Sequence, residues 1–379
     1  MLYLTDCTVL IHIVCVGCIP RRARFRRKGS VKGKGVKLRP VIASYSGESS
    51  SNIRQFLDEN VLEVIASIAR SPKNSAEIAR DVLAELDEMH VLKEQAGLVR
   101  LDTSVFLRND IECILNTVTP LAKESCQRTL ECGAAFRNAP PEITIFLGGI
   151  IGLVQGLGAT LRQKNIGVDW KSYPGKYAQS KVDFDEVCDV YDAIGPDYLN
   201  KSVLQGERYT AVFIGPGGHN FLLFTHTMNT PDLSKRYVEH LNRYLVDAYA
   251  MLVKGEIQNE PLRASAEAAN MYKQGRPRTA VITNETIQEY KSAIQAIIDA
   301  VSSYYVGKLP ILDTLLRSTT AGQQGVPPAN MMLNLWRYIR KVTAKELYSC
   351  GFFTDTIPEE GTLTVFYEND VELIRQLLI

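Results

Sequence analysis

The ten residues VFLRNDIECI at positions 105–114 recur without a gap as VFYENDVELI at positions 365–374, with Val, Phe, Asn, Asp, Glu and Ile identical in register. In both copies a short β-prone run leads into a helical pattern whose start carries Asn and Asp, residues that accept hydrogen bonds from the exposed backbone N–H groups of a first turn. The repeat therefore predicts one strand-to-helix unit in the first third of the chain and a second at its end.

Residues 51–125 form a series of short elements that includes the first copy. Apolar spacing, caps and helix breakers predict elements over 52–69, 76–80, 83–95, 98–101, 105–107 and 109–130. Pro72 ends the first helix, because a residue before proline disfavours the α region. Gly97 ends the third, since glycine readily adopts the left-handed conformation after a helix C-terminus. The predicted order is helix, short helix, helix, two-stranded wing and long helix.

Two stretches of this segment carry a family resemblance, SAEIA at 75–79 for the second helix and AGLV at 96–99 for the entry to the wing. The segment resembles the winged helix-turn-helix domain of arsenical-repressor-type and multiple-antibiotic-resistance-type regulators. The resemblance implies DNA binding, a dimer, and a core that senses a small-molecule or protein effector. The connection before the third helix is shorter than in the family and lacks its usual glycine.

Charge along the same segment favours a different use of the fold. Acidic side chains outnumber basic ones over 75–95, and like charge opposes the approach of a helix to phosphates. A winged helix used for packing or dimerisation is therefore the alternative. The charged residues are Glu77, Asp81, Glu85, Asp87, Glu88 and Glu94 against Arg80 and Lys93.

Residues 309–379, which contain the second copy, predict a second winged helix. Its expected elements are a short helix over 311–317, a long helix over 329–347, a wing tip at 359–361 and a return strand over 362–367. In the long helix, cations recur four residues apart on one face and an apolar stripe occupies another. We expect DNA contacts from Arg337, Arg340, Lys341 and Lys345, with Arg100 and Arg108 near the first wing as weaker candidates.

That basic face has an alternative interpretation, in which it is solvated or docked on the acidic remainder of the chain. Burial of Arg337 and Lys341 beneath other segments would exclude the expected interface. The two interpretations differ in exposure, which the sequence does not determine.

The middle of the chain, residues 135–308, predicts a mixed α/β domain. Gly148, Gly152 and Gly156 are spaced by four in an apolar helix, which predicts a smooth face for close helix–helix approach. Strands are expected over 209–214 and 220–225. The glycine-rich connection between them is a turn or, less favoured, an anion cradle. The weak ligand-binding candidates there are Gly215, Gly217, Gly218 and His219. No catalytic or metal-binding constellation and no cofactor motif is predicted.

Charge is distributed unevenly over the 379 residues. Positions 1–40 hold ten Lys/Arg and one acid, a net charge of +9, and the remaining 33 basic and 41 acidic residues give −8. A body of net negative charge has no general attraction for nucleic acid, so DNA binding requires a local basic patch. The apolar run 2–19 is short for a span of about 20 residues, and its basic flank follows it. We interpret residues 1–50 as a basic, disordered extension.

The eight cysteines are scattered through apolar contexts, and C-x-x-C at Cys15–Cys18 lacks a second pair at zinc-site spacing. Free thiols and a cytoplasmic location are expected.

These observations together predict an α+β, predominantly helical protein with winged-helix modules flanking a mixed α/β middle domain. The expected domains are 51–134, 135–308 and 309–379. The favoured function is a homodimeric DNA-binding transcriptional regulator with a sensing or dimerisation domain and no membrane partner. The first alternative is a scaffold that uses winged helices for protein contacts. The second is an enzyme with a site near residues 215–226.

Overall fold

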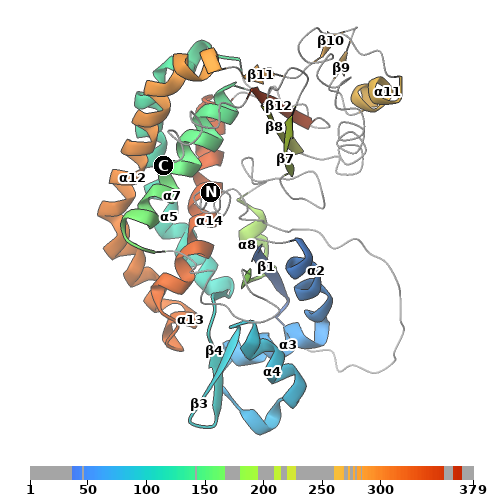
Figure 1. The fold of residues 1–379 in the computed structure, drawn as a ribbon. Helices are drawn as coiled ribbons and strands as arrows, with labels where there is room; N and C mark the ends of the chain where they lie inside the picture. The colour runs from blue at the N-terminus through green and yellow to red at the C-terminus, as the bar shows by residue number, and fades with distance from the viewer. Residues whose placement is uncertain are drawn as a thin grey trace.

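The computed structural model describes residues 36–44, 47–140, 143–166, 180–194, 209–214, 220–227, 260–268, 272–273, 276–277, 280–282, 284–353 and 362–368. Long helices packed along one another form a bundle along one side of the molecule (Figure 1). They are α5 (Arg108–Cys132), the π-helix η3 (Thr144–Leu153) that continues into α7 (Val154–Gln163), α12 (Asn284–Ser318) and α14 (Pro328–Ser349). The expected predominance of helix is confirmed.

A small domain lies at one end of this bundle. Its elements are α2 (Gly47–Phe56), α3 (Glu59–Arg70), β2 (Lys73–Asn74), the 3-10 helix η1 (Ser75–Glu77), α4 (Arg80–Glu88), β3 (Leu92–Gln95) and β4 (Leu98–Leu101). The three strands form an antiparallel sheet in the order β2-β4-β3. Ala96 and Gly97, at φ 54° and 75°, join β3 to β4 as a two-residue connection with both residues in the left-handed region.

Local chemistry explains where the elements of this domain begin and end. The helix expected over 52–69 is divided into α2 and α3 because Asp58 caps α3, its carboxylate accepting a hydrogen bond from Val61 N at 2.9 Å. The helix expected over 83–95 is shorter in the structure, where α4 ends at Glu88. His90, at φ 54°, ends the helical path, and the chain from Leu92 is a strand.

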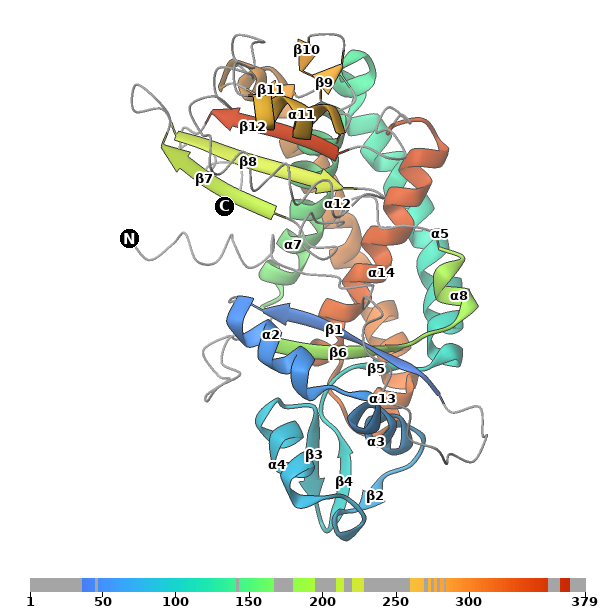
Figure 2. The ribbon, with the colours of Figure 1, turned by 90° about the vertical axis from the view of Figure 1, so that its right-hand side faces the viewer.

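A second, three-stranded sheet connects the small domain to the bundle (Figure 2). It has the order β1-β6-β5, with β1 (Leu38–Ser44) antiparallel to β6 (Ser180–Glu186) and β5 (Val105–Phe106) parallel to it. The strand expected over 105–107 therefore exists, but it pairs with β6 and is not part of the wing. The ring of Phe106 packs edge-on against Tyr338 of α14, with ring centroids 6.0 Å apart.

A four-stranded sheet with the order β11-β12-β8-β7 lies beside the other half of the bundle (Figure 2). Its strands are β7 (Tyr209–Ile214), β8 (Asn220–Thr227), β11 (Ala280–Ile282) and β12 (Thr362–Glu368). The antiparallel pairing of β7 with β8 confirms the expected hairpin strands. Strand β12, expected to return from a second wing, instead pairs with β8 and β11. The remaining elements are η2 (Ala134–Asn138), α8 (Asp189–Asp192), α11 (Glu260–Ala268), β9 (Tyr272–Lys273), β10 (Arg276–Pro277) and α13 (Thr320–Gln323).

The expected second winged-helix domain over 309–379 is wrong for the described residues. Helix α12 runs through Pro310 without a break, because Leu312 and Leu316 are fully buried in the bundle and packing outweighs the missing N–H. Helix α14 lies in the same bundle, and one continuous apolar core extends over both expected domain boundaries. The strand of the repeat occurs twice, as β5 and β12, whereas the second helix of the repeat, at 369–379, lies outside the described residues.

Two of the three spaced glycines permit the expected close helix approach, and the helix they meet is α12. A Cβ at Gly156 would lie 2.9 Å from Cβ of Val301, and one at Gly152 would lie 3.1 Å from Cγ2 of Ile297. Such distances are closer than side chains normally approach, so the absence of a side chain permits this packing. Over the described residues, no helix combines the length and the apolar character needed to cross a membrane.

Candidate functional site

The four cations expected to face DNA do not form an exposed surface, because three of them are buried. Arg337, Arg340 and Lys341 are 4%, 4% and 5% exposed, and only Lys345 of this set is exposed. The Nζ of Lys345 donates to the carbonyl of Ala193 at 3.2 Å. The expected DNA interface on α14 is therefore wrong: the basic face of this helix packs against the β1-β6-β5 sheet instead of facing solvent.

A carboxylate on β6 explains why Arg337 of α14 faces inward. The guanidinium of Arg337 forms an ion pair with Asp185, whose side chain is completely buried. Asn334, one turn earlier, accepts from Arg337 Nε at 3.2 Å and donates through Nδ2 to Asp185 Oδ1 at 3.2 Å. The same Nδ2 donates to Ser104 Oγ at 3.0 Å. These contacts satisfy a charge that would be very unfavourable if buried alone.

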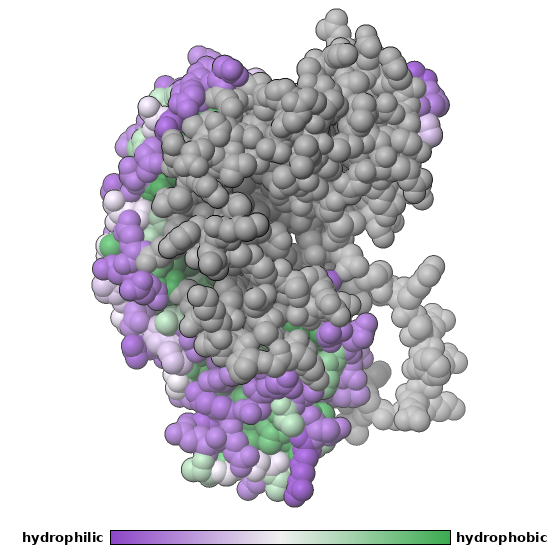
Figure 3. Space-filling view, viewed as in Figure 1, coloured by the Kyte–Doolittle hydropathy of each residue, from purple (hydrophilic) through white to green (hydrophobic). Residues whose placement is uncertain are grey.

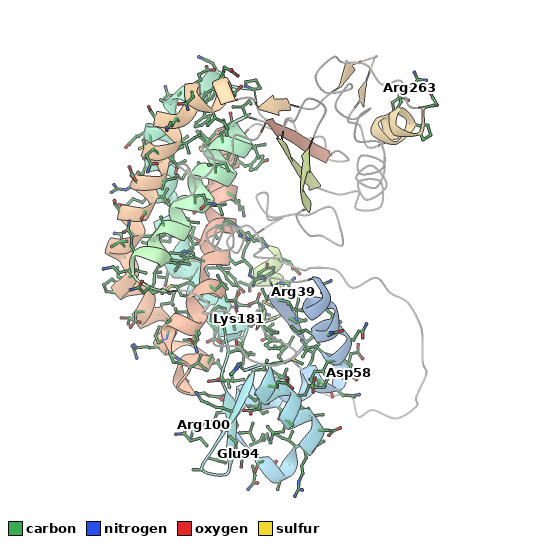
Figure 4. The ribbon with its side chains drawn as sticks, viewed as in Figure 1. Arg39, Asp58, Glu94, Arg100, Lys181 and Arg263 are labelled. Carbon is green, nitrogen blue, oxygen red and sulfur yellow. The ribbon has the colours of Figure 1, made fainter. Side chains whose placement is uncertain are left out.

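Asp183 forms a second buried charge contact on the same strand. Its carboxylate pairs with Lys181 and accepts from Thr103 Oγ1 at 2.8 Å and from Ser104 N at 3.2 Å. Figure 4 labels Lys181 near Arg39, at the junction of the bundle and the sheet. An acidic cluster in a sequence is usually solvated, but here charged residues 181, 183 and 185 alternate with apolar residues 182 and 184. That period of two is the signal for a strand with one polar face, and it could have identified these residues.

The ring of Tyr191 on α8 completes the network. The cationic groups of Arg39, Lys341 and Arg337 lie 4.2, 3.9 and 5.5 Å from its centroid, and Tyr338 packs edge-on at 5.6 Å. Each cation is within the distance at which an aromatic ring attracts positive charge. We refer to Arg39, Lys181, Asp183, Asp185, Tyr191, Asn334, Arg337 and Lys341 as the buried charge network. Its contacts fix α14 and α8 on the sheet, which is a structural role.

The two weaker candidates lie in separate places. Arg108, at the start of α5, forms ion pairs with Glu112 at 3.0 Å and with Asp189 at 3.2 Å, and its hydrogen bond to Glu112 and the charge of Asp189 raise the pKa of Arg108. Arg100 is half-buried on β4, where it is the register partner of Lys93.

The other candidates do not form a described site. Gly215, Gly217, Gly218 and His219 lie outside the described residues, although the flanking strands β7 and β8 are present. Within the part of the chain that the structure describes, no group of three or more His, Cys, Asp or Glu side chains is arranged to hold a metal ion.

The surface of α4 differs from the network in being open to solvent. We call its exposed acidic residues and those of the adjacent elements the acidic face, which consists of Glu77, Asp81, Asp87, Glu88 and Glu94. Arg80 is exposed beside it, whereas the ammonium group of Lys93 is held by Asp102 at 2.9 Å. Leu98, in the hairpin next to the β3–β4 turn, is 38% exposed. Figure 3 shows apolar residues among hydrophilic ones over this end of the molecule.

Comparison with known proteins adds no relative: no family model matches the chain, and no match is found among the curated proteins or among the solved structures.

Proposed function

We propose that this chain is a scaffold protein that binds a partner protein through the acidic face. The observation that carries the proposal is the charge of residues 75–95, where five exposed carboxylates occur with one exposed cation, Arg80. A partner with a basic, partly apolar surface complements this face, because Leu98 adds exposed apolar area at the hairpin.

The arrangement of the small domain supports its interpretation as a winged helix. Helix α3, strand β2, η1, helix α4 and the β3–β4 hairpin follow one another, and the central strand of the sheet is β4. In the resemblance drawn from the sequence, α4 takes the position of the helix that enters a DNA groove. An acidic helix in that position favours protein contact, since phosphates would repel it.

DNA binding through the remaining cations has less support. Arg108 is engaged by two carboxylates, and Arg100 is half-buried. A regulator would need a basic patch to overcome the negative charge of this end of the molecule. A cytoplasmic location remains part of the proposal and agrees with the free thiols of the five described cysteines.

Site-specific photo-crosslinking tests the proposal in the cells that produce the protein. A photoreactive residue replaces Ala84, which is exposed on α4, or Ser303, which is exposed on α12 and is the matched control. We expect a discrete protein adduct from position 84 that is absent from position 303. The adduct is expected to disappear when Asp81→Lys and Asp87→Lys reverse the charge of the face.

Two results would contradict the scaffold proposal. One is an adduct that survives both charge reversals, because the contact would then not depend on the acidic face. The other is binding of the purified chain to duplex fragments in a gel shift with a steep salt dependence, which indicates phosphate contacts. An adduct with the mass of two copies would identify the partner as the chain itself.

A further inference from the structure

Two cysteines far apart in the sequence meet near one end of the bundle. Cys126 lies on α5, and Cys350 caps the C-terminus of α14. Their Sγ atoms are 3.6 Å apart although 224 positions separate the residues. Both are free thiols, and this distance is close to van der Waals contact between sulfur atoms. The bundle therefore holds two thiols in position for a reaction with each other.

The two thiols differ in their access to solvent. Cys350 is exposed and lines a cavity of about 360 Å³, together with polar residues that include Gln127, Glu131 and Arg137. Cys126 is 5% exposed and does not line the cavity. A small solute entering the cavity meets Cys350 first, so the geometry assigns different roles to the two sulfurs.

The protonation of Cys126 agrees with this order. Burial, together with the hydrogen bond and the charge of Cys350, raises the pKa of Cys126 to about 12. The thiolate is the reactive form of cysteine, so Cys126, which stays protonated at neutral pH, reacts only slowly with an external oxidant. Cys350 donates a hydrogen bond to the carbonyl of Leu347 at 3.3 Å, which orients its sulfur at the end of the helix.

We propose that Cys350 and Cys126 form a reversible intramolecular disulfide when the protein meets a peroxide. The Cys350 sulfur attacks one peroxide oxygen, the O–O bond breaks, and Cys350 becomes a sulfenic acid while, for hydrogen peroxide, water leaves. The Cys126 sulfur then attacks the sulfur of that sulfenic acid. The S–S bond forms, the S–O bond breaks, and the oxygen leaves as a second water after accepting the Cys126 proton. Two thiols are oxidised and one peroxide is reduced to two waters.

The fold around Cys350 permits the required movement. A disulfide needs sulfurs about 2.05 Å apart, so they must approach by about 1.5 Å. Cys350 is the C-cap residue of α14. It precedes Gly351, which has a φ of 77° and where an added Cβ would meet no atom within 4 Å. Phe352 and Phe353, which follow, are buried, so the movement falls on the exposed side chain of Cys350, whereas Cys126 stays in the core. The disulfide then joins α5 to α14.

Peroxide treatment of the full chain tests the proposal. Non-reducing peptide mapping by mass spectrometry is expected to find one linked peptide pair, Cys126–Cys350, that dithiothreitol removes. The linked pair should be lost in Cys126→Ala and Cys350→Ser and retained in Cys113→Ser, a matched variant because Cys113 is an exposed thiol on the same helix. In Cys126→Ala, dimedone should label Cys350 after peroxide.

Three results would overturn the proposal. They are a different principal cysteine pairing in the treated protein, alkylation of native Cys126 as fast as that of Cys350, and dimedone labelling of Cys126 in Cys350→Ser but not of Cys350 in Cys126→Ala. Circular dichroism of each variant shows whether the fold is retained. If Cys126→Ala does not fold, Cys126→Ser provides the same test.

Discussion

The buried charge network makes a sharp prediction for Arg337→Ala. The change removes the guanidinium that pairs with Asp185, and Asp185 stays in place with no exposure to water. Asn334 still donates to it, but one amide does not replace a positive charge. Removing one partner of a buried ion pair costs about 3–5 kcal/mol of folding free energy, so we expect a destabilisation in this range.

Lys345→Ala is the matched control on the same helix. Lys345 is exposed and makes one hydrogen bond, to a backbone carbonyl on the surface. Its removal should cost about 1 kcal/mol or less. If the sequence-based interface on α14 had been correct, the two substitutions would have had similar, small effects on stability, because both side chains would be solvated.

Urea unfolding of both variants measures the difference. Far-UV circular dichroism reports the helical bundle. Tryptophan fluorescence reports the two tryptophans of the chain, of which Trp336 is buried and donates through Nε1 to the Leu157 carbonyl at 2.7 Å. The double variant Arg337→Met with Asp185→Asn should recover part of the loss, because no uncompensated charge remains. Equal midpoints for Arg337→Ala and Lys345→Ala would refute the reasoning.

Three further predictions concern the bundle and its contacts. Gly156→Ala should destabilise the protein by about 1–2 kcal/mol because the new Cβ would lie 2.9 Å from Val301. Gly307→Ala, in open space on α12, should stabilise the protein by about 0.5–1 kcal/mol. Thermal unfolding should therefore show a lower midpoint for the first variant and a higher midpoint for the second. Asp110→Ala should cost about 1–3 kcal/mol because two backbone N–H groups lose their acceptor. Burial raises the pKa of Asp110, so its protonated form contributes most to the stability of the wild type at low pH, and this contribution is lost as the pH rises through that pKa. The difference in unfolding free energy between the wild type and Asp110→Ala should therefore become smaller as the pH rises through the acidic range. Burial also raises the pKa of Tyr305 to about 12, so the wild type should lose stability from about pH 10, the ordinary tyrosine value, upwards. Because burial raises the pKa of Tyr304 and Tyr338 as well, Tyr305→Phe should lose less stability than the wild type in alkaline unfolding, but should still lose some.

The positions of most helices could be predicted from the sequence because local signals set them. Pro328 starts α14 near its expected first residue, and the glycine spacing identified the face of α7 that packs on α12. Gly97 precedes the expected strand at Leu98–Leu101, but it lies in a turn between two strands and does not end a helix, and Ala96 also adopts positive φ there. The end of α4 was placed too late, since the left-handed conformation of His90 has no strong local signature.

The buried charge network could not be predicted in the same way. Helix α14 carries apolar residues on one face and cations on another, and periodicity alone does not show whether the cationic face meets water or protein. Its counter-charge, Asp185, is 152 positions away on a strand that pairs with β1 and β5. The sequence shows the alternation of charged and apolar residues on β6, but not the helix that covers it.

The amino-acid sequence by itself determined the helical character, the approximate places of the helices in the small domain, the acidity of α4 and the smooth glycine face, because these depend on neighbours within a few residues. Only the tertiary structure decided that the cations of α14 are internal, that β5 and β12 belong to different sheets, and that Cys126 and Cys350 meet. Those outcomes depend on pairings between distant segments, whose energies come from burial and charge compensation across the fold.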